Sequence, residues 1–315
     1  MKNFLGQTIA AVGFFAVASS AMAETWSPPG PIKFLIAFAA GGGADTQARM
    51  IAAELEAAKG WKIIPEQATG KGGLNAVKAL GAAPKDGTTI AMIVTESLAY
   101  NMRASGAGGP DAATPITTTA GSEMAVVALT SKGYETLDDV IEAAKGGEAI
   151  RFGAMSPALA DLAYVIGKEN DVDFNIIQVK GGKAVMNGLN AGDMDVGFGA
   201  GIQAKAVAAG EMVELASAKS VPLVGTPDAP MLTEYGVEFT NDTMFLIAGP
   251  GGMDPMARDA IAAAVAEVLT TGGSEAAGFI TKGFGGVKMH AGDELTAMIQ
   301  DAYDQAGGLL EASSE

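Results

Sequence analysis

Four short segments follow the carboxyl ends of predicted strands: 41–45 (GGGAD), which opens a predicted helix, 95–97 (TES), 154–158 (AMSPA) and 181–183 (GGK). Glycine lets a ligand approach the backbone closely, and the first N–H groups of a helix are free to donate hydrogen bonds. The helix dipole favours negative charge there, so a carboxylate suits such a junction. One junction alone is equally well explained as a tight turn. Four together predict an anion-binding crevice at the carboxyl edge of α/β sheets.

The elements that position these segments alternate short apolar strands with alanine-rich helices. Strands are predicted at 33–38, 62–65, 88–94, 149–153, 174–179, 194–198 and 244–248. Helices are predicted at 45–60, 74–82 and 255–270, and the first ends at a glycine that can cap it. Residues 104–115 are predicted to form a surface loop. The alternation predicts an α/β fold with largely parallel sheets.

Residue patterns that would support catalysis or metal binding are sparse. The chain has no cysteine, its only histidine is His290, and no serine lies in a G-x-S-x-G turn. The glycines at 41–43 lack dinucleotide-loop spacing, and those at 70–73 lack the G-K-[ST] of a phosphate loop. Asp193 and Asp195 are expected to alternate on a strand and so to face the same side. Such a pair could bind a cation, but a strand that enters from a turn explains the two acids more simply. We therefore expect no catalytic residue, no metal and no cofactor.

The first 23 residues have the pattern of an export signal. Lys2 precedes the apolar stretch 8–17, and Ala21 and Ala23 form an A-x-A cleavage site. The stretch is too short to span a bilayer, so we expect a free, soluble, periplasmic chain that begins at Glu24. Loss of Lys2 changes the formal net charge from −16 to −17, which argues against nucleic acid and anionic lipid as partners. The remaining 292 of 315 residues suffice for one large domain or two lobes.

Seven short motifs occur in order along most of the mature chain. They lie at 40–45 (followed by Arg49), 70–75, 84–89, 152–157, 179–182, 192–196 and 227–236. Together they resemble the Bug family, the extracytoplasmic receptors of tripartite tricarboxylate transporters. The resemblance implies a periplasmic binding protein of the Venus-flytrap kind, type II-like, with two α/β lobes joined by crossing hinge strands. It implies that residues 24–120 and 221–315 form lobe 1 and that residues 121–220 form lobe 2.

The resemblance also implies a ligand site in which loops of both lobes hold one carboxylate, largely through backbone N–H groups. Carried over to this sequence, the first-lobe residues are Gly42, Gly43, Ala44 and Asp45, and the second-lobe residues are Ser156, Pro157, Ala158, Gly181 and Gly182. Thr95, Glu96 and Ser97 would line the floor, and Lys183 would add positive charge beside the second-lobe loop.

Two departures from the family pattern bear on the ligand. Glu96 places an acid near an anion site, which weakens binding unless it points away, pairs with a cation, or recognises an amine or hydroxyl. Met155 offers a soft apolar surface in a loop where the family has more glycine. We expect a carboxylate whose other end is not simply another acid.

These observations predict a monomeric solute-binding protein that delivers a small organic carboxylate to the membrane subunits of its transporter. One alternative keeps the fold but has the loaded receptor signal to a membrane sensor. A second alternative, from a different class, is a secreted two-domain enzyme that uses Asp45, Glu96 or Asp195 as acid or base in the same cleft.

Overall fold

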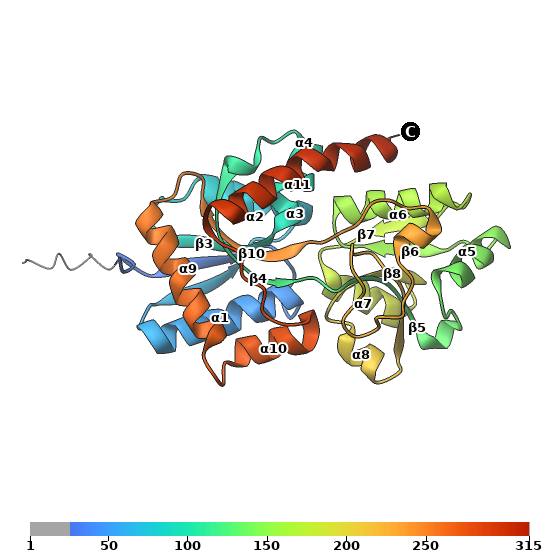
Figure 1. The fold of residues 1–315 in the computed structure, drawn as a ribbon, viewed down its shortest axis with the longest axis horizontal. Helices are drawn as coiled ribbons and strands as arrows, with labels where there is room; N and C mark the ends of the chain where they lie inside the picture. Colours follow the sequence, from blue (N-terminus) through green and yellow to red (C-terminus); the bar gives the residue numbers. More distant parts are fainter. Residues whose placement is uncertain (1–25, 315) are drawn as a thin grey trace, which may run out of the picture.

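The computed structural model describes residues 26–314, and the predicted export signal lies outside them. Two five-stranded mixed sheets form the centres of two α/β lobes (Figure 1). Lobe 1 is built on the sheet with strand order β2-β1-β3-β10-β4, and lobe 2 on the sheet with order β7-β6-β8-β5-β9. This arrangement confirms the predicted two-lobed α/β fold.

The strands of lobe 1 are β1 (Ile32–Ile36), β2 (Ile63–Gln67), β3 (Thr89–Val94), β4 (Ala113–Gly121) and β10 (Met244–Pro250). Those of lobe 2 are β5 (Met124–Leu129), β6 (Arg151–Ala154), β7 (Asn175–Gln178), β8 (Val196–Ala200) and β9 (Met212–Ser217). In each sheet the strands formed by strand–helix–strand units pair in parallel, as predicted. One strand in each sheet, β10 in lobe 1 and β5 in lobe 2, pairs antiparallel with both of its neighbours.

Helices cover both faces of each sheet. Around lobe 1 lie α1 (Gly43–Lys59), α2 (Leu74–Gly81), α3 (Thr95–Leu98), α4 (Tyr100–Ser105), α9 (Pro255–Thr270), α10 (Glu275–Phe284) and α11 (Gly292–Ala312). Around lobe 2 lie α5 (Leu137–Lys145), α6 (Pro157–Glu169), α7 (Gly182–Ala191) and α8 (Ala204–Ala208). Each sheet is therefore covered on both sides, which explains why central strands such as β3 (TIAMIV) are buried at every position.

Alternate residues of one strand supply two separate cores. In β1, Phe34 and Ile36 pack with α1 and α9, whereas Leu35 packs on the opposite face with α2. Ile51 of α1 and Phe34 are fully buried, and burial of one such side chain contributes about 2–3 kcal/mol. These two layers fix the carboxyl end of β1 and the start of α1, where a glycine loop joins them.

Two crossing segments join the lobes, and hydrogen bonds brace them. Between β4 and β5, Ser122 donates its backbone N–H to the carbonyl of Thr243, which precedes β10, at 2.8 Å. The buried Glu123 pairs with Lys219 at 2.6 Å, and Lys219 follows β9. The crossing segments are therefore held side by side at the level of the gap between the lobes (Figure 1).

Some predictions about local structure were wrong. Residues 104–115 are not a loop throughout, because β4 begins at Ala113. Asp193 and Asp195 do not alternate on a strand, because β8 begins at Val196. The region after His290, which was not predicted as an element, is the 21-residue helix α11, and it contacts α4 of lobe 1 and α6 of lobe 2.

The segment that returns from β9 packs on lobe 2 before it reaches lobe 1. Its side chains Leu232, Tyr235 and Val237 belong to the core built around Phe152 and Phe198. The division of the chain at residues 120 and 220 stays a prediction.

Candidate functional site

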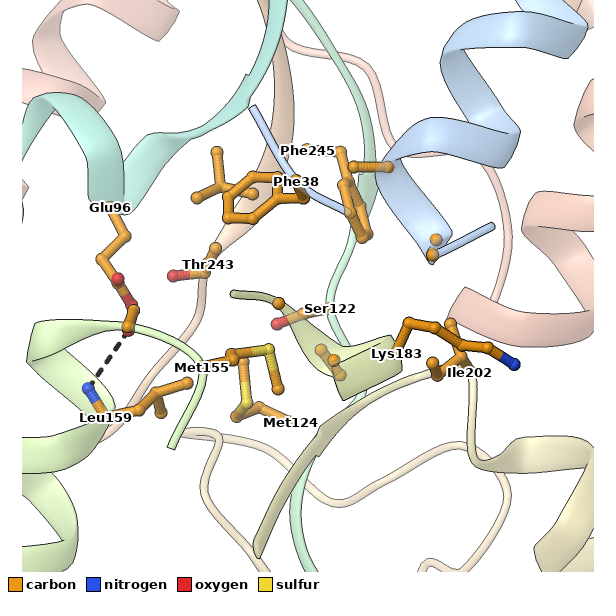
Figure 2. A pocket seen from close by; sticks show the side chains of 18 of the residues that line it. Phe38, Glu96, Ser122, Met124, Met155, Leu159, Lys183, Ile202, Thr243 and Phe245 are labelled. Atoms are coloured by element: carbon orange, nitrogen blue, oxygen red, sulfur yellow. Dashed lines mark hydrogen bonds between the residues drawn. The ribbon is translucent and has the colours of Figure 1, made fainter. Parts of the chain in front are cut away.

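A small cavity of about 70 Å³ lies between the lobes (Figure 2). Its lining comes from the strand ends of both sheets, from the starts of three long helices and from both crossing segments. The site therefore suits a small molecule.

Three α-helices begin at this cavity, one from lobe 1 and two from lobe 2. Gly42 precedes α1, Ser156 precedes α6 and Gly181 precedes α7, and all three residues line the cavity. The Ser156 hydroxyl accepts the N–H of Leu159 at 3.2 Å, which caps α6, while the other two helices start without a side-chain cap. Uncapped first-turn N–H groups and the dipoles favour a bound anion at this end.

The loops of the two lobes approach to contact distance beside these helix starts. A β-carbon added to Gly42 would lie 3.7 Å from Cβ of Lys183, and one added to Gly181 would lie 3.5 Å from Cβ of Phe38. Gly181 also has φ of 95°, a left-handed conformation that favours glycine. The two loops are therefore close enough for one ligand group to contact both.

The walls of the cavity are mostly apolar. They are formed by Phe38, Val94, Met124, Met155, Leu159, Ile202, Phe245 and Phe284. The rings of Phe245 and Phe284 pack edge to face with centroids 4.9 Å apart, which fixes the lobe 1 wall. In Figure 2 the aromatic side chains lie on one side and the two methionines on the other. A ligand therefore meets hydrocarbon along most of its length.

Glu96, at the start of α3, is the only acidic side chain among the cavity-lining residues, and it is 7% exposed. Its Oε1 accepts a hydrogen bond from Asn101 at 3.0 Å and its Oε2 accepts one from Asn241 at 2.8 Å. Burial raises the pKa of Glu96, and hydrogen bonds from Ser156 and the two asparagines oppose that rise. All of these partners are neutral.

Two hydroxyl groups from the crossing segments face the same space. Ser122 is 3% exposed, and its Oγ has no hydrogen-bond partner in the described part of the chain. Thr243 belongs to the other crossing segment and also lines the cavity. Figure 2 shows the hydroxyl oxygens of Ser122 and Thr243 pointing into the cavity. A buried hydroxyl without a partner is unusual, so this end of the cavity has unused polar capacity.

Comparison with known proteins places this geometry in a family. Residues 47–314 match the family model described as the tripartite tricarboxylate transporter family receptor. The chain belongs to this family. This match confirms the resemblance found in the sequence. The family consists of solute-binding receptors, not of enzymes.

Solved structures share the receptor's fold. BugD superimposes with a TM-score of 0.78 at 19% identity, covering 91% of this chain and 99% of that chain. MatC from Rhodopseudomonas palustris with bound malate gives 0.76 at 20% identity, covering 90% and 99%. A further R. palustris protein, with adipate, gives 0.79 at 18% identity, covering 91% and 98%. These likenesses show a common fold.

Most of the predicted site residues of the receptor line the cavity. They are Gly42, Gly43, Ala44, Glu96, Ser156, Gly181, Gly182 and Lys183. Lys183 is exposed, and its ammonium points away from the centre in Figure 2. The remaining predicted residues, Asp45, Thr95, Ser97, Pro157 and Ala158, lie outside the lining.

Internal contacts explain why the polar residues of this second set do not line the cavity. The Asp45 carboxylate accepts the N–H of Gly41 and the Nε of Arg49, both at 2.9 Å, so it stabilises the glycine loop from within. Thr95 accepts the N–H of Met244 at 3.1 Å. Ser97 is fully buried and donates to the carbonyl of Gly72 at 2.8 Å.

Pro157 and Ala158 belong to the first turn of α6, between Ser156 and Leu159, which both line the cavity. Ala158 packs with Tyr100 and Ala306 on the side of α4 and α11. Both residues therefore shape the helix start rather than the cavity wall.

Sequence reasoning missed the crossing-segment residues Ser122, Met124 and Thr243 and the aromatic residues Phe38, Phe245 and Phe284. Phe38 directly precedes the glycine loop, so its position at a strand end was a usable signal. Ser122 and Thr243 carry no motif, because their place in the site depends on how the two crossing segments pair.

Other residues considered for chemistry lie apart from the cavity. Asp195 is buried and bonds Arg151 and Lys132, and His290 pairs with the exposed Glu294 at 2.8 Å. Within residues 26–314 there is no group of three or more His, Asp or Glu side chains placed to hold a metal ion. No helix in that part of the chain is long and apolar enough to cross a membrane.

Proposed function

We propose that the receptor captures a small organic carboxylate in the cavity between its lobes. The observation that carries this proposal is the convergence of the uncapped starts of α1 and α7, one from each lobe, on one cavity with apolar walls. Free N–H groups and aligned dipoles favour a carboxylate at that end, and the walls accept its hydrocarbon part. The neighbours with malate and adipate support this choice of ligand class.

Gly42, Gly43 and Ala44 from one lobe and Gly181 and Gly182 from the other hold the carboxylate through their backbones. Because the two loops are within contact distance of each other, a bound carboxylate bridges the lobes and stabilises the closed form. The receptor binds and releases its ligand chemically unchanged. It acts as a monomer in the periplasm and delivers the ligand to membrane subunits of a tripartite transporter.

A thermal-shift screen of the purified mature chain tests ligand capture. Di-, tri- and aromatic carboxylates are compared with uncharged sugars of similar size. A carboxylate at about 100 times its Kd stabilises the folded protein by roughly 2.7 kcal/mol, a shift of several degrees. If no carboxylate raises the melting temperature, the proposal fails.

Export is tested separately by producing the full chain in a Gram-negative host. The expected result is protein in the periplasmic fraction with Glu24 as its first residue. Uncleaved protein in the cytoplasm or the membrane would contradict the periplasmic assignment.

A further inference from the structure

The Glu96 end of the cavity differs from the carboxylate end in charge and in the kind of groups that line it. At the carboxylate end the polar groups are backbone N–H donors. Away from these helix starts they are the Glu96 carboxyl, which when ionised only accepts hydrogen bonds, and the hydroxyls of Ser122 and Thr243, which accept as well as donate. A ligand that spans the cavity therefore needs an acceptor at one end and a donor at the other.

The carboxyl group of Glu96 has hydrogen-bond donors that stabilise its ionised form, but it lacks a positive partner. Donors from Asn101, Asn241 and Ser156 converge on it, and hydrogen bonds of this kind stabilise a carboxylate. Burial without a countercharge opposes ionisation. A cation supplied from the cavity would remove this conflict, because an opposite charge within a few ångströms stabilises the ionised form.

The surroundings of Glu96 do not supply that cation. The Lys183 ammonium points away from the cavity centre (Figure 2). A second hollow borders the far side of Glu96, and its charged or titratable lining residues are Tyr100, Glu238 and Asp242. These groups add negative charge or none, so the local potential favours a positively charged ligand group.

From this charge pattern, and resting on the proposed function, we infer that Glu96 recognises an ammonium group and that the ligand is an amino carboxylate. Its carboxylate lies at the starts of α1 and α7, and its ammonium donates to Glu96 and to the Ser122 and Thr243 hydroxyls. The unpartnered Ser122 Oγ is thereby given a donor. A second carboxylate in the same position would instead face the Glu96 carboxylate, and like charges repel.

The test measures binding of matched ligand series by calorimetry. Linear amino carboxylates from glycine to 6-aminohexanoate are compared with the hydroxy acid and the dicarboxylate of the same chain length. The expected result is at least tenfold tighter binding of one or more amino carboxylates than of both counterparts.

Glu96→Gln removes the charge while keeping the shape of the side chain. The Oδ1 atom of Asn241 is buried without a partner, so rotation of this amide accommodates the new NH₂ group, while Asn101 keeps its donor bond to the Gly72 carbonyl. Affinity for the amino carboxylate should fall about 100-fold, with no fall for its hydroxy counterpart. The matched control is Glu238→Gln, which removes an exposed carboxylate from the hollow behind Glu96 and should change affinity less than about twofold.

The outcomes separate this inference from the proposed function. If a dicarboxylate or hydroxy acid binds most tightly and Glu96→Gln leaves or improves that binding, the ammonium inference is wrong and carboxylate capture stands. If no member of any series binds, both fail. If Glu96→Gln and Glu238→Gln weaken binding of the amino carboxylate equally, the effect comes from the overall negative charge of the region and Glu96 does not contact the ammonium.

Discussion

Two buried carboxylates, Asp195 in lobe 2 and Glu96 in lobe 1, differ in the charge of their hydrogen-bond partners. Asp195, before β8 in lobe 2, receives Arg151 and Lys132 as partners, both within 3 Å. Glu96, after β3 in lobe 1, receives only neutral donors and lines a cavity. A charge that the chain neutralises by itself contributes to stability, whereas a charge left without a partner at a cavity is available to a ligand. The following predictions test that contrast.

The largest expected effect comes from filling the cavity. The Gly182 backbone is compatible with a side chain, and a β-carbon there would lie 3.7 Å from the Met155 side chain. Gly182→Phe should weaken binding of any ligand found in the screens at least 100-fold, because the ring occupies the ligand volume. The melting temperature of the ligand-free protein should change little.

The matched control for this variant is Gly278→Phe in α10, where the glycine is exposed and a β-carbon meets nothing within 4 Å. It should bind normally in the same calorimetric titration. Normal binding by Gly182→Phe would place the ligand elsewhere.

Removing the paired charge should reduce stability rather than binding. Burial alone would raise the pKa of Asp195, but its hydrogen bonds with Arg151 and Lys132 outweigh burial and lower it. Asp195→Asn should cost about 2 kcal/mol of unfolding free energy, since both cations lose a partner but stay partly exposed. Chemical denaturation measures this cost. The exposed neighbour variant Asp193→Asn should change stability by less than about 0.5 kcal/mol, and an equal loss in both would contradict the role of the pair.

The apolar wall should contribute less than the backbone anchor. Met155 lines the cavity from lobe 2, and Met155→Ala removes hydrocarbon that packs on the ligand body. We expect about tenfold weaker binding of ligands with an apolar body. Met298→Ala on the exposed face of α11 is the control, and it should leave affinity unchanged. Equal effects of the two variants would show that the cavity wall does not contact the ligand.

The smallest expected effect concerns the ligand-free protein. Because burial raises the pKa of Glu96, the folded chain binds more protons than the unfolded chain between the unfolded value of about 4.3 and the raised value. Stability attributable to Glu96 is therefore present at low pH and is lost as pH rises through this window.

In Glu96→Gln this loss should disappear, so the variant should gain stability relative to the parent as pH increases. Melting temperatures of both proteins without ligand, measured from acidic to neutral pH, check the prediction. Tyr100, Glu238 and Asp242 share the hollow behind Glu96 and are present in both proteins. If the difference between the two melting temperatures stays constant from acidic to neutral pH, the raised pKa of Glu96 is contradicted.

The sequence was sufficient to predict the parts of the site that depend on local backbone. The apolar run before the glycines predicted β1, and the helix after them matches α1, because strand burial and helix periodicity are local patterns. The glycine loops at residues 42–44 and 181–182 were found in the same way. Asp45 lies at the start of α1 as predicted, but its carboxylate accepts hydrogen bonds from Gly41 and Arg49 and so stabilises the glycine loop instead of lining the cavity.

The parts that depend on pairing across the molecule were not predictable. Ser122 and Thr243 enter the site only because the two crossing segments bond to each other between the lobes. The helix α11 spans both lobes, yet its glycines at 307 and 308 weaken its signal as a helix in the sequence. The two partners of Asp195 lie far from it in sequence, so pattern alone gave no reason to expect an ion pair.

The most direct test of carboxylate capture is a crystal structure of the mature protein with its tightest ligand from the binding series. We expect the ligand carboxylate within about 3 Å of backbone N–H groups at the start of α1, near Gly43 and Ala44, and at the start of α7, near Gly182. A ligand bound outside this cavity, or one whose carboxylate faces Glu96 while the helix starts contact other groups, would contradict it.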